Sequence, residues 1–436
     1  MVQVGGAPAN ASAQNGSGFL LPWVIVLFFA WGFSTCMVDL LAPALKAVFT
    51  LTNFEAGLTQ FAFFLGYFVI SLPASALLSK LGYLRSIVLG LLIMMVGCLL
   101  FAPAANAGVF WGFLAALFIL ASGITILQVA ANPIVTMLGK AETASSRLTF
   151  AQFLNSFGTF IAPFIGSALI LSHIEKAPDP ATLTQAQLEA LRHTQAQAVQ
   201  APYMVIAAVL AVLALIFFLL RNHDHAPKPE KAPSLGEMFG LLRRKRLAFA
   251  VLCIFLYVGA EVSIGTYMTT YLSQPNTLAL PLSSAGHMVA YYWGGAMVGR
   301  LIGAWVLARV SPGKVLAFCA VGASVLIAVS AFSTGFTAGY AIIAVGLFNS
   351  VMFPTIFAIA LAGTGTKMPA ASGLLCMAIV GGALLPPATG FLGDHIGLGL
   401  AFLLPAACYL VIALFGWTSR KPEVEVEVEP APAITN

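Results

Sequence analysis

The chain has 436 residues, of which 60% are hydrophobic and only 8% are charged, and its mean hydropathy is +0.96. Because soluble domains carry about 25% charged residues, this composition excludes a soluble enzyme and indicates a polytopic membrane protein. The net charge of +5 does not indicate nucleic-acid binding, because the basic residues follow the pattern of a membrane topology. No nucleotide-binding loop, pair of catalytic carboxylates or metal-ligand cluster is recognisable, so neither an enzyme nor a cofactor is expected.

Twelve long apolar runs follow one another along the chain, six in each half. They occupy residues 19–46, 53–78, 84–104, 109–138, 147–173 and 201–221, then 248–273, 284–310, 313–333, 337–362, 370–393 and 398–419. Helices of these lengths can cross the ~30 Å hydrocarbon core of a bilayer. The pattern predicts an all-α membrane protein with bundles at 19–221 and 248–419, a cytoplasmic basic linker at 222–247, and disordered tails at 1–18 and 420–436.

The Lys and Arg residues predict the orientation. With both termini cytoplasmic, 16 of the 20 basic residues lie inside, three (Lys46, Lys176 and Arg192) lie outside, and Arg300 lies within a span. This asymmetry is the one that membrane insertion favours. Two short basic turns, at 77–85 and 306–314, occupy equivalent places in the two halves. Two parallel six-helix halves with such a turn indicate the major facilitator architecture, in which substrate binds at mid-membrane between the halves.

Two segments between spans have the spacing of a helix N-terminal capping box. Ser234 and Glu237 in the linker predict a short helix, which either rests on anionic lipid or simply connects the bundles. Thr182 and Gln185 precede a Gln- and Ala-rich stretch and predict a short extracellular helix over 182–200.

Asp39 is the one charged residue between Leu20 and Leu45. An ionised carboxylate inside a span costs about 2.5–3.5 kcal/mol on insertion scales, so Asp39 must be partnered, hydrated or neutral. A carboxyl group that can be either charged or neutral within a membrane is a candidate proton carrier.

Uncharged amides recur at helical spacing in the fourth and fifth runs. Gln128 and Asn132 are four residues apart, and Gln152 and Asn155 are three apart. Amides supply donors and acceptors without charge, which suits a neutral polyhydroxylated ligand; the alternative is hydrogen bonding between helices. With an amide of the tenth run and two aromatic residues on which a sugar ring can stack, the predicted substrate-binding set is Gln128, Asn132, Gln152, Asn155, Asn349, Trp31 and Tyr257.

Two charged residues lie within spans of the second half. Glu261 is near the middle of the seventh run, and Arg300 is in the eighth. They are candidates for a structural ion pair. The alternative is that Glu261 is a second proton site or a sugar ligand.

Four stretches resemble the fucose–galactose–glucose:proton symporters of the major facilitator superfamily. They are residues 28–33 (FFAWGF) with Asp39 following, 123–139 (GITILQVAANPIVTMLG), 147–158 (RLTFAQFLNSFG) and 255–265 (FLYVGAEVSIG). The resemblance extends over about 19–420 and implies proton-driven monosaccharide uptake, with Asp39 as the protonatable acid. The fucose branch has a glutamate where this chain has Gln128, so the chain is more similar to the glucose/galactose branch. Since an amide cannot titrate, Asp39 is expected to act alone or with Glu261.

The sequence thus predicts a multi-pass protein of a bacterial inner membrane that imports a glucose- or galactose-like hexose with a proton by alternating access. Its expected partners are a neutral monosaccharide, a proton and the lipid bilayer, and a monomer is expected. Alternatives are another monosaccharide, such as fucose or N-acetylglucosamine, and uncoupled sugar diffusion. A proton-coupled drug exporter is disfavoured by the amide-rich fourth and fifth runs.

Overall fold

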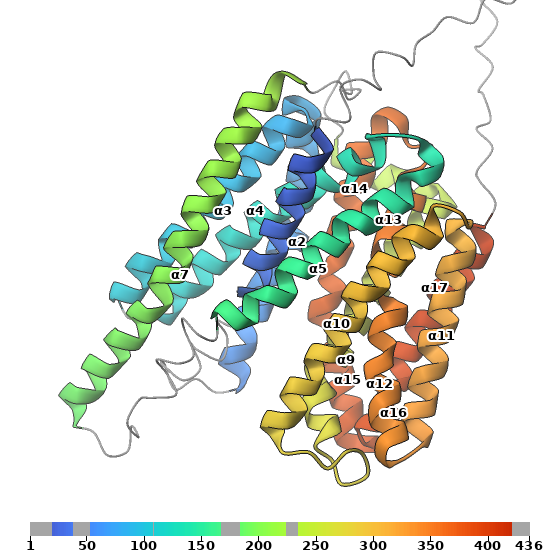
Figure 1. Cartoon of the computed structure of the whole chain (residues 1–436). Helices are drawn as coiled ribbons and strands as arrows, with labels where there is room; N and C mark the ends of the chain where they lie inside the picture. The colour runs from blue at the N-terminus through green and yellow to red at the C-terminus, as the bar shows by residue number, and fades with distance from the viewer. Residues whose placement is uncertain (1–19, 38–52, 108, 167–183, 224–233, 421–436) are drawn as a thin grey trace, which may run out of the picture.

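The computed structural model describes residues 20–37, 53–107, 109–166, 184–223 and 234–420, and every regular element in these ranges is a helix (Figure 1). The first bundle contains the helix Leu20–Met37, α2 (Asn53–Leu81), α3 (Tyr83–Ala107), α4 (Phe110–Met137), α5 (Ala144–Gly166) and α7 (Gln185–Leu220). The second contains α9 (Lys245–Leu272), α10 (Leu282–Leu307), α11 (Pro312–Phe332), α12 (Gly335–Asn349), α13 (Met352–Leu361), α14 (Met368–Met377), α15 (Gly381–Ile396), α16 (Leu398–Ala401) and α17 (Leu403–Thr418).

Within the described residues, ten helical stretches are long and apolar enough to cross a membrane. They coincide with ten of the predicted runs. The other two predicted runs correspond to α5 and α10, which are helical but contain polar residues such as Gln152 and Arg300. The predicted tails, and the part of the first run that contains Asp39, lie outside the described residues.

The predicted extracellular helix and the sixth span form one continuous helix, α7, of 36 residues. Its capping box is formed by Thr184 and Gln187, two residues later than the spacing of Thr182 and Gln185 suggested. The predicted linker helix is α8 (Leu235–Gly240), and its capping box is formed by Ser234 and Glu237 as expected. α9 already begins at Lys245, so the described linker is slightly shorter than predicted.

Small residues bring helices of each bundle into close contact. A Cβ atom added at Gly123 of α4 would lie 2.5 Å from the backbone nitrogen of Met94 on α3. In the second bundle, a Cβ added at Gly313 of α11 would lie 2.5 Å from the carbonyl oxygen of Gly416 on α17. Close approach through small residues is the usual way in which helices associate in lipid.

Three arginines at helix ends stack on an aromatic residue one turn earlier. The guanidinium carbon lies 3.8 Å from the ring centroid for Arg221 over Phe218, 4.1 Å for Arg309 over Trp305, and 4.3 Å for Arg420 over Trp417. Each arginine also donates to the carbonyl oxygen of the residue on which it stacks. Both bundles therefore have helix ends of the kind that occurs at a membrane surface.

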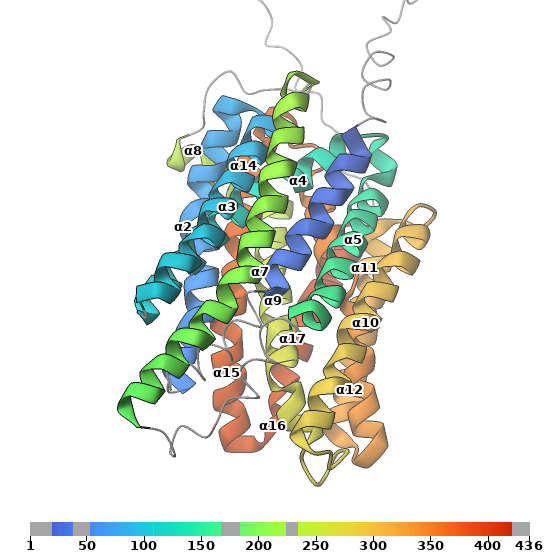
Figure 2. The same cartoon turned by 60° about the vertical axis from the view of Figure 1, so that its left-hand side comes forward.

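The two bundles contact each other mainly through α5 against α10 and α13, and through α14 against α2 and α4. In the view of Figure 1 they meet at the end that carries α13 and α14 and separate towards the end that carries α16. Two serine hydroxyls cross the interface: Ser146 donates to the carbonyl oxygen of Ala304 (2.6 Å), and Ser372 donates to that of Val129 (2.8 Å). Figure 2 gives a second view of α5 beside the second bundle.

Candidate functional site

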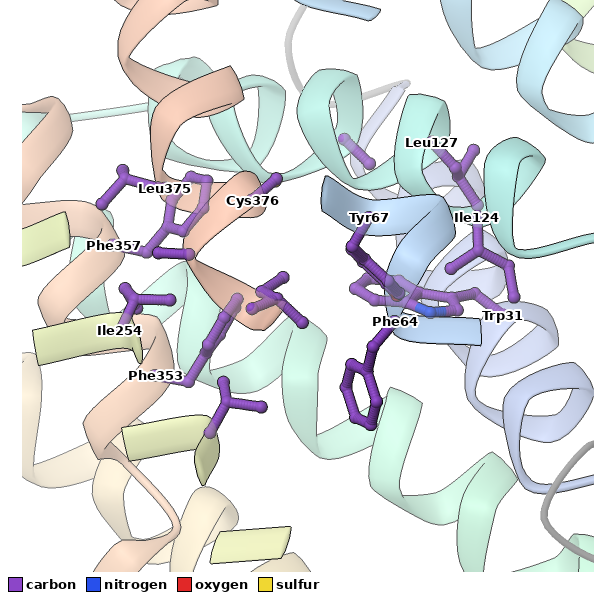
Figure 3. Packing of buried hydrophobic residues seen from close by; sticks show 14 of the residues in the cluster. Trp31, Phe64, Tyr67, Ile124, Leu127, Ile254, Phe353, Phe357, Leu375 and Cys376 are labelled. Atoms are coloured by element: carbon purple, nitrogen blue, oxygen red, sulfur yellow. The ribbon is translucent and has the colours of Figure 1, made fainter. Parts of the chain in front are cut away.

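A tyrosine and an amide lie at the centre of the first bundle's inner face. The Gln128 side chain on α4 donates from Nε2 to the hydroxyl oxygen of Tyr67 on α2. The Oε1 atom of Gln128 is buried and has no hydrogen-bond partner among the described residues. Figure 3 shows Tyr67 beside Trp31, which is also buried. A sugar hydroxyl could donate to the Gln128 oxygen without any change in the bond to Tyr67.

The next amides along this face are buried with polar atoms unsatisfied. Asn132 is completely buried, and within the described chain neither its Nδ2 nor its Oδ1 atom has a partner. On α5, the Nε2 atom of Gln152 is buried and likewise unpaired in the described ranges. A buried polar group left unsatisfied costs about 1–3 kcal/mol. Together with Gln128, these side chains leave both donor and acceptor atoms buried and unpaired on α4 and α5.

Asn155 has a different role in this structure. Its Nδ2 atom donates to the carbonyl oxygen of Phe28 (3.0 Å), which joins α5 to the first helix. Thr159, one turn later, donates to the carbonyl oxygen of Gly32. The structure therefore uses Asn155 as an interhelical contact, the alternative that the sequence left open for the amides.

The predicted ion pair of the second bundle is not formed in this structure. The Glu261 carboxylate accepts a hydrogen bond from the hydroxyl of Tyr257 (2.8 Å) on the same helix, α9. Arg300 donates from Nε to the carbonyl oxygen of Ser350 (3.1 Å) and from Nη1 to the hydroxyl of Ser156 on α5. The two charges interact only electrostatically. Arg300 instead connects the bundles, and Glu261 retains a second carboxylate oxygen for another donor.

Asn349 is fully buried inside the second bundle. Its Nδ2 atom donates to the hydroxyl of Tyr292 (2.6 Å) and, more weakly, to that of Tyr409 (3.5 Å). Both tyrosines are completely buried and interact electrostatically with Glu261. Asn349 therefore joins α12 to α10 and α17 through two tyrosine hydroxyls.

Asp39 lies two positions beyond Met37, outside the described residues. The carbonyl oxygen of Met37 accepts a hydrogen bond from the Tyr203 hydroxyl on α7 (2.9 Å). This bond holds the end of the described first helix, two residues before the acid in the sequence.

The sequence interpretation missed a polar stripe on α2. Tyr67, Ser71, Ser75 and Ser79 are four residues apart and all are buried. Ser71 and Ser75 face Gly373 of α14, where an added Cβ would lie 2.7 Å from the Ser75 Cβ atom. The spacing of four residues in an otherwise apolar helix is the signal that identifies this face.

Replacing Asn132 with leucine should raise thermal stability or leave it unchanged, because it removes two unsatisfied buried polar atoms. The same change should weaken sugar binding about tenfold, because a ligand loses its hydrogen bonds at this position. Asn349→Leu is the matched control, and it should lower stability because it breaks the bond to Tyr292. Thermal unfolding and sugar binding of the two purified variants test this. A large stability loss in Asn132→Leu with unchanged sugar affinity would make Asn132 a structural residue.

Comparison with known proteins agrees with this architecture. The family model of the Major Facilitator Superfamily matches residues 23–378. The glucose/galactose transporter of Brucella abortus is 47% identical over 412 residues, which cover 94% of this chain and 97% of that protein. The L-fucose-proton symporter of Escherichia coli is 36% identical over 422 residues, which cover 93% of this chain and 94% of that protein.

A solved structure shows the same arrangement of helices. The crystal structure of FucP, a major facilitator superfamily transporter in the outward conformation, matches with a TM-score of 0.84 and 34% identity. The match covers 93% of this chain and 99% of FucP. The family resemblance expected from the sequence is confirmed. The chain belongs to the major facilitator superfamily, in the family that contains the glucose/galactose transporters and the fucose–proton symporters.

Proposed function

We propose that this protein imports a glucose- or galactose-like hexose together with a proton across a bacterial inner membrane. The observation that carries the proposal is the set of buried amide atoms without partners on Gln128, Asn132 and Gln152. An uncharged site with paired donor and acceptor capacity matches the hydroxyl groups of a sugar. Support also comes from the 47% identity to a glucose/galactose transporter and the 36% identity to a fucose–proton symporter.

In the proposed topology α5 and α10 also cross the membrane, which gives twelve spans with both termini in the cytoplasm. The end at which α5, α10 and α14 meet is then cytoplasmic, and the structure is the outward-facing state. The match to FucP in the outward conformation supports this assignment. The positive-inside distribution of basic residues supports it independently.

Alternating access then requires the contacts at the cytoplasmic end to break and re-form in each cycle. Three hydrogen bonds cross the interface: Ser146 to Ala304 and Ser372 to Val129 towards that end, and Arg300 to Ser156 deeper, about halfway along α5. A typical hydrogen bond contributes about 0.5–1.5 kcal/mol net, and one to a charged group about 1.5–3. These bonds together are weak enough to be offset by sugar binding and by a change in the protonation of the first-span acid.

The proton is proposed to act through Asp39, which is neutralised from the outside before sugar binds and is deprotonated to the inside afterwards. Desolvation in an occluded state favours the neutral carboxyl. Gln128 cannot titrate, and it contributes hydrogen bonds to the sugar. Glu261, whose carboxylate accepts a hydrogen bond from Tyr257, is proposed as the second candidate for proton coupling. Trp31 and Tyr257 are the proposed stacking residues.

Uptake of radiolabelled glucose into proteoliposomes tests the function directly. An inward proton gradient should stimulate uptake, and unlabelled galactose should compete more strongly than fucose or N-acetylglucosamine. Control vesicles without the protein give the background. Equal uptake with and without the gradient would make the protein a sugar facilitator. Stronger competition by fucose or N-acetylglucosamine would show that one of these sugars is the preferred substrate. It would not contradict symport.

A further inference from the structure

A groove of about 380 Å³ lies on the outer surface of the interface between the bundles. It is formed mainly by the first turns of α5 and the last turns of α10, two helices that contact each other closely. Leu21 of the first helix closes one side. The groove is at the proposed cytoplasmic end, and none of the candidate sugar-site amides lines it. The proposed function does not use it.

Two arginines give the groove its charge. Arg147 is held by the end of α4 and the turn that follows it. Its Nε donates to the carbonyl oxygen of Val135 (3.1 Å), and its Nη2 donates to that of Thr136 (2.7 Å). Its Nη1 donates to the carbonyl oxygen of Lys140 (2.8 Å) and to the hydroxyl of Thr143 (2.6 Å), so Arg147 contributes mainly its charge. Arg309 is exposed and uses only Nη1, in its bond to the Trp305 carbonyl oxygen. Its remaining N–H groups have no partner in the described chain. None of the residues that line the groove is acidic, so the groove itself supplies no carboxylate to either arginine.

The other walls of the groove are apolar and continue onto the lipid-facing surface of α10. Phe150 is 40% exposed, Leu301 is 47% exposed, and Trp305 is 62% exposed. Tryptophan is enriched at the level of lipid headgroups, and arginine side chains extend from the hydrocarbon edge towards water. The groove thus presents positive charge at its membrane-surface end and an apolar wall below it.

We propose that this groove binds an anionic glycerophospholipid of the cytoplasmic leaflet. The phosphate accepts hydrogen bonds from the unused N–H groups of Arg309 and is attracted by the charge of Arg147. An acyl chain lies along Phe150, Leu301 and Trp305. Basic pockets between transmembrane helices on the cytoplasmic side recognise anionic headgroups in this way. Since α5 and α10 belong to different bundles, a bound lipid bridges the interface next to the bond between Ser146 and Ala304.

The chain's own tails are poorer occupants of the groove. Residues 1–19 contain no charged side chain, so they cannot neutralise the arginines. Residues 421–436 contain four glutamates but no aromatic residue, Leu or Met. Burying these carboxylates against the lipid-facing wall would be costly. A lipid supplies both the negative charge and the apolar surface.

Native mass spectrometry of the purified full-length protein, titrated with phosphatidylglycerol, tests the proposal. Arg309→Gln should weaken phosphatidylglycerol binding about fivefold, the loss expected for one basic residue at a membrane surface. Ala308→Glu, which adds an acid at another lining residue, should weaken it at least as much. Arg420→Gln is the matched control, because Arg420 stacks on Trp417 as Arg309 stacks on Trp305 but lies outside the groove. It should bind phosphatidylglycerol as the wild type does.

Three results would overturn the proposal. Equal weakening in Arg309→Gln and Arg420→Gln would mean that the groove is not the site. Displacement of the lipid by millimolar glycerol phosphate would indicate a free-anion site that does not recognise acyl chains. Binding that is detected only after residues 421–436 are deleted would identify the acidic tail as the occupant. The readout is lipid binding, so a failure of the proposed sugar transport would not affect the outcome.

Discussion

Replacing Asp39 with asparagine should abolish proton-driven sugar accumulation while exchange of internal for external sugar continues. One proton moving down a potential of 100 mV supplies about 2.3 kcal/mol, which supports a concentration ratio of roughly fifty. Asparagine has a similar size but cannot be protonated. In the variant, the internal sugar concentration should therefore not rise above the external one. Uptake against a gradient and equilibrium counterflow, measured in the same proteoliposomes, separate the two activities.

Asp394→Asn is the matched control for this experiment. Asp394 is an exposed acid near the end of α15, and its replacement should leave accumulation unchanged. If accumulation survives in Asp39→Asn, another residue must couple proton movement to sugar transport. Glu261→Gln would then be the next variant, because Glu261 is an acid within a span of the second bundle and one of its carboxylate oxygens is bonded to Tyr257. Loss of both accumulation and counterflow in Asp39→Asn would indicate a ligand contact and not proton coupling.

Replacing Gly373 with leucine should shift the protein towards the state that is open at the end where the bundles meet. A Cβ atom at Gly373 would lie 2.7 Å from the Ser75 Cβ atom and 3.0 Å from the Ser71 carbonyl oxygen. Overpacking typically costs about 1–3 kcal/mol, equivalent to a shift in population of roughly five- to 150-fold. Because Gly373 is on α14 and the two serines are on α2, separation of the bundles at this end relieves the clash.

Electron–electron distance measurements between spin labels at Lys140→Cys and Lys367→Cys report this change. Both positions are exposed, one in each half, and the distance should lengthen in Gly373→Leu. Gly286→Leu is the control, because an added Cβ there meets no atom within 4 Å. A short distance together with normal transport in Gly373→Leu would show that α2 and α14 need not approach closely in the cycle.

The helical architecture could be predicted well because hydropathy is a property of each segment alone. The ends of α3, α4, α9 and α11 lie within about three residues of the predicted runs. Interruptions inside runs were not predicted. The tenth run is divided at Ser350 and Val351, and the eleventh contains a short 3-10 turn at Ala378–Val380. All of these residues except Ser350 are apolar, so no local pattern distinguishes the break from the helix around it.

The sequence predicted which polar side chains lie inside the bundles better than it predicted their hydrogen-bond partners. The amides at 128, 132 and 152 could be identified because an unpaired amide in a span is costly wherever it lies. The hydrogen-bond partner of each side chain depends on which helices pack together and through which faces. A single sequence does not specify this packing. Asn155 bonds to the backbone of Phe28, and Arg300 reaches Ser156 in place of Glu261. Those partners are 127 and 144 residues away in the chain.

The stacked arginines at the ends of α7, α10 and α17 constrain the kind of motion that transport can use. One of these helices belongs to the first bundle and two to the second, and each ends in a guanidinium held over an aromatic ring. Sliding a bundle along the membrane normal would move such a charge into hydrocarbon, at about 2.5–3.5 kcal/mol per arginine. Tilting about an axis in the membrane plane leaves the helix ends near their original depth. The anchoring therefore disfavours an elevator-type displacement and permits rotation of the bundles against each other.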